Sequence, residues 1–157
     1  MTSPVFKFPK PVEKDITLVI VSFNTRDILL RCLGSIKKYT QDISYEVILI
    51  DNFSEDGTVK AVVELFPEVQ VIANKNNRGF SAANNQGIVE SKGQKVALLN
   101  PDTLLTENSF KKINDFMEAP PEFSILGTGI VDKNNQPCPI RLWEDTPQDA
   151  ALKIMGL

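Results

Sequence analysis

Residues 15–36 read DITLVIVSFNTRDILLRCLGSI, and this stretch decides the fold class. Ile16–Val21 is an unbroken apolar run rich in β-branched residues, which is typical of a short strand buried on both faces. After a polar turn, apolar residues recur at helical spacing at Ile28, Leu29, Cys32, Leu33 and Ile36. A buried strand that leads directly into an amphipathic helix predicts a βα unit.

The same alternation continues along the chain. Further strands are predicted at Glu46–Ile50, Val69–Ala73, Lys95–Leu99 and Phe123–Val131, the last of them interrupted by Gly127 and Gly129. Helices are predicted to begin near residues 24–27, 54–58, 79 and 106–109. Because strands alternate with helices of about 10–15 residues, we expect an α/β fold: a Rossmann-like, mostly parallel sheet with helices on both faces.

Capping residues set the expected helix ends. Asn24, with an acid three positions later at Asp27, is typical of a helix start. Gly93 is expected to close the helix that spans Gly79–Ser91. Asp56 is expected to stabilise the start of the second helix rather than to contact a ligand, because a carboxylate is favourable at a helix N-terminus whatever the function.

Three parts are expected along the chain. Residues 1–14 are rich in proline and lack sustained periodicity, which indicates an N-terminal arm, with an edge strand at Val5–Phe8 as the alternative. Residues 15–131 are expected to form the α/β domain. Residues 132–157 are expected to form a proline-punctuated loop and a short helix at Ala150–Met155.

The composition excludes several classes of function. A chain of 157 residues with 42% apolar and 24% charged residues is typical of one globular domain. It contains no histidine, which excludes Ser-His-Asp and Cys-His catalysis and most zinc catalysis. The net charge is −3 without a basic block, so we expect no nucleic-acid partner. The first strand–helix turn has no glycine and there is no P-loop, which argues against a dehydrogenase or a nucleotidyltransferase.

Membrane and secretion signals are also missing from the sequence. No apolar run approaches the ~20 residues that a membrane span needs, and the N-terminus has no apolar signal region. We therefore expect no transmembrane segment and a cytoplasmic location, with peripheral association at the inner membrane face as an open alternative.

Polar residues follow each of the first four predicted strands: Ser22 and Asn24, then Asp51 and Asn52, then Asn77, Arg78 and Gly79, then Asn100, Pro101 and Asp102. In open α/β sheets, ligands bind outside the carboxyl ends of the strands, where the strand order reverses. With the order 3-2-1-4, Asn24 and Asp102 would face each other across that point, with Asp51 one strand away. The sequence therefore predicts a ligand site at this edge.

Each of these residues also has a purely structural interpretation. Asp51 could brace the following loop, and Gly79 could supply a positive φ to an ordinary loop. Asn100-Pro101-Asp102 could be a type I turn. Pro101 must end its strand, so Asp102 leaves the strand end in a reproducible direction. One carboxylate with phosphate oxygens and water is a common way to hold Mg²⁺, which keeps a metal role for Asp102 open.

Four segments in this order resemble the inverting family 2 glycosyltransferases of the GT-A fold: Val19–Asn24, Asp51–Thr58, residues 77–88 and Leu98–Asp102. The resemblance covers Asp15 to about Val131. The Asn-Pro-Asp form of the last segment is most similar to the rhamnosyltransferase-type branch that acts on bacterial surface polysaccharides.

The resemblance implies transfer of a sugar from a nucleotide-diphosphate sugar, of the UDP or dTDP type, to a saccharide or lipid-linked acceptor. Its implied nucleotide-sugar-binding residues are Ser22, Asn24, Asp51, Asn52, Asn77, Arg78, Gly79 and Asn100. Among these, Asp51 would accept a hydrogen bond from the imide of uracil or thymine. Asp102 would ligate Mg²⁺ or Mn²⁺ bridging the diphosphate, which supplies Lewis-acid catalysis.

Two features depart from the family pattern. The family's metal motif has acids at both ends, whereas Asn100 takes the first position here, which implies weaker metal affinity or ribose recognition by an amide. The family's general base lies in a later, acceptor-binding segment, and Glu144-Asp145 is interpreted as a solvated loop instead. The chain is therefore expected to be a donor-binding part without its own general base. A non-catalytic nucleotide-binding or interaction module on the same fold is the alternative.

Overall fold

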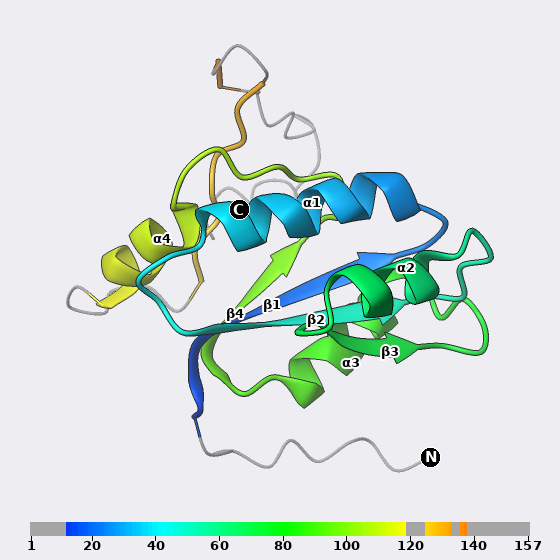
Figure 1. Cartoon of the computed structure of the whole chain (residues 1–157). Coiled ribbons are helices and arrows are strands. Elements are labelled where there is room, and N and C mark those ends of the chain that lie inside the picture. The colour runs from blue at the N-terminus through cyan, green and yellow to red at the C-terminus, as the bar shows by residue number, and fades with distance from the viewer. Residues whose placement is uncertain (1–11, 119–124, 133–135, 138–157) are drawn as a thin grey trace, which may run out of the picture. The chain divides into compact units, whose positions relative to one another are not determined.

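The structure is a computed structural model that describes residues 12–118, 125–132 and 136–137. The chain divides into two compact units, Met1–Phe116 and Met117–Leu157. Strands and helices alternate along the chain (Figure 1) as β1 (Lys14–Ser22), α1 (Arg26–Tyr39), β2 (Tyr45–Asp51), α2 (Thr58–Leu65), β3 (Gln70–Ala73), α3 (Phe80–Glu90), β4 (Gly93–Leu99) and α4 (Ser109–Glu118).

All strand pairings in the sheet of the first unit are parallel. The order is β3-β2-β1-β4, which is the order considered in the sequence analysis. Ser22 lies opposite Asp51, and Asp51 lies opposite Ala73 on its other side. The carboxyl ends of the strands therefore share one edge, called the carboxyl edge below, and the strand order reverses between β1 and β4.

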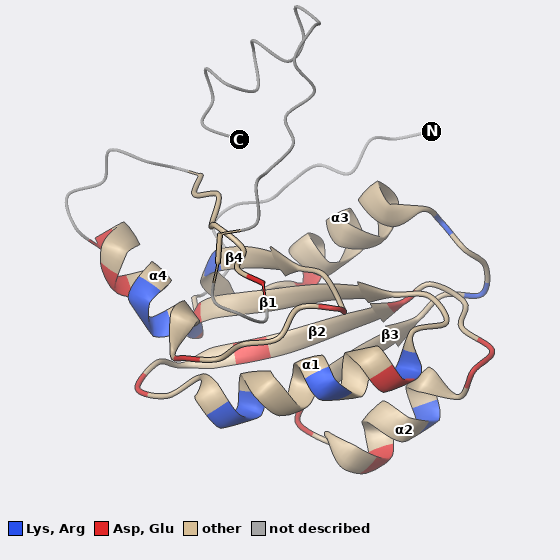
Figure 2. Ribbon diagram, turned by 90° about the horizontal axis from the view of Figure 1, so that it is seen from above, with Lys and Arg blue, Asp and Glu red and all other residues tan. Residues whose placement is uncertain are grey.

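Helices cover both faces of the sheet, with α1 and α2 on one face and α3 on the other (Figures 1 and 2). Alternate residues of β1 explain this: Ile16, Leu18 and Ile20 join the core that α1 and α2 cover. Val19 and Val21 join a second core with Ala83 of α3. Burying one such side chain contributes roughly 1.5–3 kcal/mol, so the unbroken apolar run of β1 stabilises both layers.

Two glycines let backbone segments approach closely. A Cβ on Gly87 of α3 would lie 2.4 Å from Cγ1 of Val19, so the helix can contact the sheet only without that atom. A Cβ on Gly93 would lie 2.4 Å from the backbone N of Thr17. The expectation that Gly93 closes α3 was wrong: the helix ends at Glu90, and Gly93 is the first residue of β4. Glycine is needed at position 93 because β4 lies close to the backbone of β1 there, and not because it caps a helix.

The start of α1 also differs from the sequence prediction. Thr25 is the N-cap, and no side chain of the local sequence caps the helix. Asn24 has a left-handed φ of 53° instead, and Asp27 pairs with the Arg26 guanidinium at 2.9 Å. The carboxylate of Asp56 takes the capping role, because its Oδ2 accepts a hydrogen bond from the Arg26 N–H at 2.9 Å. A distant residue thus replaced the predicted local cap.

In the second unit, the predicted strand Phe123–Val131 is wrong over its described part. Residues 125–130 have no regular structure, and Val131 forms only an isolated antiparallel bridge with Pro137. Gly127 and Gly129 offer no side chains to pack, which weakens a strand. Ile125 and Ile130 are correspondingly exposed.

Several other predictions lie outside the described residues: the edge strand at Val5–Phe8, the loop at Glu144-Asp145 and the helix at Ala150–Met155. The predicted arm ended at Lys14, whereas β1 already begins there. The three-part division at residues 14 and 131 stays a prediction.

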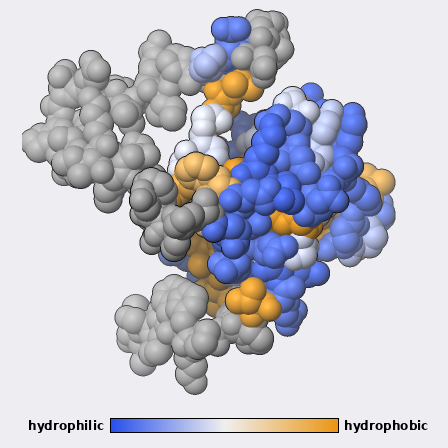
Figure 3. Space-filling view, turned by 90° about the vertical axis from the view of Figure 1, so that its left-hand side faces the viewer, coloured by the Kyte–Doolittle hydropathy of each residue, from blue (hydrophilic) through white to orange (hydrophobic). Residues whose placement is uncertain are grey.

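The surface carries mixed charge. Segments of Lys and Arg and segments of Asp and Glu are both spread over the described helices and loops (Figure 2). On the face shown in Figure 3, hydrophilic residues predominate and apolar residues form small groups. Over the described part of the chain, no helix is long and apolar enough to cross a membrane.

Candidate functional site

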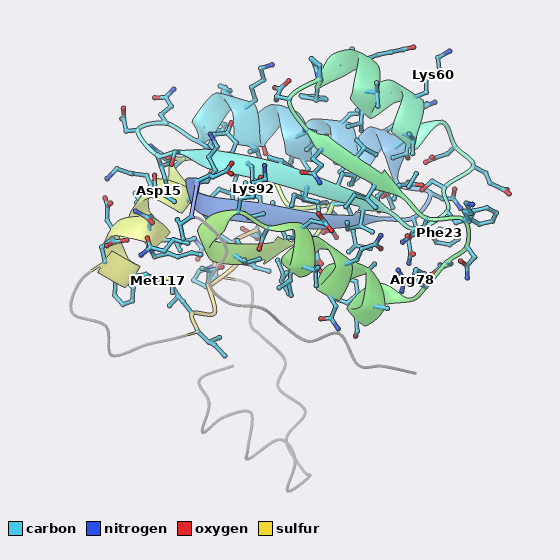
Figure 4. The ribbon with its side chains drawn as sticks, turned by 90° about the horizontal axis from the view of Figure 1, so that it is seen from below. Asp15, Phe23, Lys60, Arg78, Lys92 and Met117 are labelled. Atoms are coloured by element: carbon cyan, nitrogen blue, oxygen red, sulfur yellow. The ribbon has the colours of Figure 1, made fainter. Side chains whose placement is uncertain are left out.

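The predicted site residues lie along the carboxyl edge. Ser22 ends β1 and Asp51 ends β2, and the remaining predicted residues lie in the loops that follow the four strands. In Figure 4, Phe23 and Arg78 lie toward this end of the sheet, and Asp15 and Lys92 lie toward the opposite end. The topology therefore brings together residues that are separated widely in sequence.

Asp51 is the most unusual group at this edge. It is only 2% exposed, although it is a carboxylate at the end of a strand. Its Oδ2 accepts a hydrogen bond from the Ser54 N–H at 2.9 Å. No described group donates to Oδ1, which is also buried. Buried acceptors are nearly always paired, and leaving one unpaired costs about 1–3 kcal/mol. Oδ1 is therefore suited to accept a hydrogen bond from an external donor.

Ser22 is fully buried beside Asp51. Its hydroxyl shares a hydrogen bond with Oγ1 of Thr25 at 2.9 Å, and its carbonyl accepts one from the Asn52 N–H at 2.8 Å. The side chain thus shapes the turn between β1 and α1, and direct contact with a ligand stays a prediction.

Asn52 is buried and organises the loop after β3. Its Nδ2 donates to Oδ1 of Asn77 at 2.7 Å, and its Oδ1 accepts from the Arg78 N–H at 2.9 Å. The Asn74 amide also donates to Oδ1 of Asn52, at 3.2 Å. Oδ1 of Asn77 additionally accepts from the Gly79 N–H at 2.9 Å. Asn52 and Asn77 therefore brace the loop, and whether they also touch a ligand stays a prediction.

Arg78 is exposed beside the N-terminus of α3. Its backbone is held by Asn52, and Nη1 lies 3.4 Å from Oε1 of Gln86. Gly79, with φ 80°, opens the helix directly after it. A guanidinium and a helix N-terminus both favour a bound anion, so this corner of the site suits a phosphate.

Asn24 joins the loop after β1 to the loop after β2. Its N–H donates to Oγ of Ser54, and its Oδ1 accepts from the Glu55 N–H, both at 2.9 Å. The cap of α1 by Asp56 is a further tie between these loops. The two loops are therefore fixed to each other beside Asp51.

Asn100-Pro101-Asp102 forms a turn. The carbonyl of Asn100 accepts a hydrogen bond from the Thr103 N–H at 3.2 Å, and both Asn100 and Asp102 have exposed side chains. Asp102 lies near enough to α1 to act on Cys32. Burial, with a smaller contribution from the Asp102 charge, raises the pKa of that thiol to about 12. The thiol is therefore kept protonated, and Asp102 is the charged group at this end of β4.

The described residues contain no group of three His, Cys, Asp or Glu side chains that could hold a metal ion. Asp102 would thus contribute a single carboxylate to any cation. Mg²⁺ and related ions are often held by one or two carboxylates together with phosphate oxygens and water. The residues present fit a cation that arrives with a diphosphate, and they do not fit a cage made of protein alone.

Sequence reasoning missed Phe53, which has a left-handed φ of 77° and is 45% exposed. Nothing in the periodicity signals this conformation. The available signal is its position between Asn52 and Ser54, in a loop that follows a buried strand.

Comparison with known proteins identifies the family. The model of "Glycosyl transferase family 2" matches residues 17–151. The chain belongs to this family. Among curated members, the succinoglycan biosynthesis protein ExoO of Rhizobium meliloti (strain 1021) is 28% identical over 114 residues, which cover 71% of this chain and 32% of ExoO.

Solved structures share the GT-A fold with this chain. S. aureus TarS 1-349 in complex with UDP superposes with a TM-score of 0.60 at 19% identity, over 66% of this chain and 32% of that one. The mannosyltransferase PcManGT from Pyrobaculum calidifontis, in complex with GDP-Man and Mn²⁺, gives 0.59 at 21%, over 68% and 33%. The chain thus spans about a third of each of these proteins.

Proposed function

We propose that this chain binds the nucleoside diphosphate of a nucleotide-sugar donor, as the donor-binding part of an inverting glycosyltransferase. The observation that carries the proposal is the buried Asp51 carboxylate at the carboxyl edge, whose Oδ1 has no hydrogen-bond donor among the described residues. Membership of family 2 supports it. So do the nucleotides that TarS and PcManGT hold on the same fold, UDP and GDP-Man.

Asp51 would select the base. Uracil and thymine carry an imide N–H, and Oδ1 of Asp51 is an acceptor that no group in the described part of the chain pairs with. Ser22 and Asn24 would border the nucleotide from the β1–α1 loop. Asn52 and Asn77 would hold the loop that presents Arg78 and Gly79. The Arg78 guanidinium would then neutralise phosphate charge.

Asp102 would ligate Mg²⁺ or Mn²⁺ together with the diphosphate. A bound cation there supplies charge neutralisation for the departing nucleoside diphosphate. Asn100 would serve the ribose, since an amide is a poor ligand for such a cation. We therefore propose that metal affinity is weak without nucleotide and rises when the diphosphate is bound.

Inversion requires attack on the anomeric carbon by an acceptor hydroxyl, from which a general base removes the proton. We place this base, and the contacts to a saccharide or lipid-linked acceptor, outside the described residues. The rhamnosyltransferase-like branch, and thus the identity of the sugar, stays a prediction from the Asn-Pro-Asp sequence.

Base selectivity tests this proposal. Isothermal titration of the chain with UDP, dTDP and CDP, each with Mn²⁺, should show UDP and dTDP binding at least about tenfold more tightly than CDP, because N3 of cytosine is an acceptor and would face the Asp51 carboxylate unpaired. Asp51→Asn should reduce that preference or reverse it, since an amide can donate to cytosine. Asp102→Asn is the matched control: it should weaken binding of all three nucleotides without changing their order.

The competing reading, a non-catalytic interaction module, is also distinguished by these titrations. It predicts that Asp102→Asn changes neither affinity nor metal dependence. If wild type binds none of the three nucleotides with Mn²⁺ or Mg²⁺, the donor-binding proposal is wrong.

A further inference from the structure

Phe53 adopts a backbone conformation that its side chain disfavours. Its φ of 77° is in the left-handed region, where the Cβ of an L-residue crowds the carbonyl oxygen. Glycine would occupy this position without that conflict. Strained residues persist where the surrounding structure imposes the conformation, and they concentrate at functional sites. The presence of a bulky aromatic residue here calls for a compensating role.

Hydrogen bonds on both sides impose this conformation. Before Phe53, the Asn52 N–H donates to the Ser22 carbonyl at 2.8 Å. After it, the Ser54 N–H donates to Oδ2 of Asp51, and Oγ of Ser54 accepts from the Asn24 N–H, both at 2.9 Å. None of these bonds uses the Phe53 side chain. The loop would keep the same ties with glycine in its place.

Phe53 lies in the loop that follows Asp51, one residue before Ser54, whose N–H donates to the Asp51 carboxylate. The ties between Ser22 and Asn52 and between Asn24 and Ser54 bracket Phe23 on one loop and Phe53 on the other. Both rings are about half exposed, at 47% and 45%. Phe23 lies at the carboxyl edge (Figure 4). Two exposed aromatic side chains thus come from paired loops that border the buried carboxylate.

We propose that Phe53 is a binding residue for the nucleoside, offering its ring as an apolar aromatic face to the base or ribose. The inference rests on the proposed function and adds a second element to it. Asp51 reads the hydrogen-bonding edge of the base and so discriminates between bases, whereas stacking on an aromatic face is available to every base. Binding would also remove the exposed ring from water, which favours the complex.

Phe53→Gly tests this inference, because stability and binding should change in opposite directions. Relief of the backbone conflict should raise the Tm by a few degrees. Loss of the ring should weaken binding of UDP, dTDP and GDP, each with Mn²⁺, by at least about fivefold and to a similar extent. Inorganic pyrophosphate with Mn²⁺, which lacks a nucleoside, should bind equally to both proteins. Phe53→Trp should keep wild-type affinity within about threefold.

Asp42→Gly is the matched control. Asp42 is exposed, also has a left-handed φ, of 57°, and lies between α1 and β2 at the opposite edge of the sheet. This substitution should raise the Tm while leaving every dissociation constant unchanged.

Three results would overturn the inference. One is Phe53→Gly binding nucleotides as tightly as wild type, which leaves the donor-binding proposal standing. Another is a lowered Tm for Phe53→Gly, which would show that the ring holds the fold together. The third is an equal loss of pyrophosphate binding, which would place the effect on the loop as a whole. Failure of wild type to bind any nucleotide would instead remove the proposed function, and this inference with it.

Discussion

The carboxylate of Asp56 accepts hydrogen bonds from the starts of two helices. Oδ2 accepts from the Arg26 N–H of α1 at 2.9 Å, and Oδ1 accepts from the Thr58 N–H of α2 at 3.0 Å. Loss of one helix cap typically costs about 1 kcal/mol. We therefore expect Asp56→Ala to lower the free energy of unfolding by roughly 1–2 kcal/mol, measured by urea denaturation at pH 7.

Asp27→Ala is the control for that substitution. Asp27 also stands at the start of α1, but its contact with Arg26 is an exposed ion pair. Such pairs contribute about 0–1 kcal/mol, so we expect a smaller effect than for Asp56. Equal destabilisation by the two variants would contradict the capping role of Asp56.

Acid should destabilise the fold through Asp56 and Asp15. Burial alone would raise the pKa of Asp56, but hydrogen bonds from Thr58 and from the Arg26 N–H outweigh it, so the pKa is lowered. Hydrogen bonds from the Ser44 side chain and backbone lower the pKa of Asp15. A carboxyl with a lowered folded pKa contributes stability above its unfolded value, 3.8 here, and loses it as the pH falls through the folded pKa.

Urea denaturation between pH 7 and pH 2.5 measures this loss. We expect the free energy of unfolding to fall below about pH 4, and to fall less steeply in Asp15→Asn and Asp56→Asn. Variants that follow the wild-type slope would show that other carboxyls govern acid unfolding.

The positions of the polar side chains at the carboxyl edge could be predicted from the sequence, but their hydrogen-bond partners could not. Ser22, Asp51 and Asp102 could be placed at one edge because the ends of parallel strands meet there. The bracing by Asn24 could not be foreseen, since it joins residues 31 positions apart. The left-handed φ of Phe53 was equally hidden, because its neighbours on a second loop impose it.

Contact between α3 and the sheet depends on Gly87. An added Cβ would meet Cγ1 of Val19 at 2.4 Å, and Val19 is a fully buried residue with little room to move. We expect Gly87→Ala to lower the free energy of unfolding by about 1–3 kcal/mol, in spite of the better helix propensity of alanine. Chemical denaturation monitored by circular dichroism measures the change.

Gly34→Ala in α1 is the matched control. A Cβ at Gly34 would have nothing within 4 Å, so the substitution should raise stability by roughly 0.5–1 kcal/mol through helix propensity alone. Opposite signs for the two substitutions are expected. A stabilising Gly87→Ala would show that α3 does not rest on Val19.

Strands with an uninterrupted apolar sequence were predicted correctly, whereas the strand predicted over a glycine-interrupted segment was not found. Val19 belongs to a run that is buried on both faces, and β1 formed where the run predicted a strand. Residues 125–131 also contain isoleucine, leucine and valine, but Gly127 and Gly129 interrupt them and no strand formed. The role of Gly93 was predicted wrongly because the local sequence pattern does not show that the backbone of β1 lies against this glycine.

Under the proposed donor-binding function, a nucleoside diphosphate should stabilise the whole domain. A ligand at about 100 times its dissociation constant adds roughly 2.7 kcal/mol, which corresponds to a Tm rise of roughly 5–10 °C for a chain of this size. We expect this rise with UDP and Mn²⁺ in a thermal unfolding assay. In EDTA the rise should be much smaller if Asp102 and the diphosphate share a cation, as proposed.

Asp102→Ala separates the contribution of the cation from that of the nucleotide. With UDP present, this variant should show nearly the same Tm with Mn²⁺ as with EDTA. A shift that depends on Mn²⁺ as strongly as in wild type would rule out Asp102 as the metal ligand.

The ties between the β1–α1 and β2–α2 loops also limit how these two loops can be redesigned. Ser54 and Glu55 find partners on Asn24, and Asp56 finds one on Arg26. A chimera that replaces Asn24 and Arg26 with other residue types would lose the side-chain acceptor of the Glu55 N–H and the guanidinium donor to the Asp56 carbonyl. Exchange of the two loops together should therefore preserve the fold better than exchange of either loop alone. Substitutions in one loop should be accompanied by substitutions in the other among related sequences.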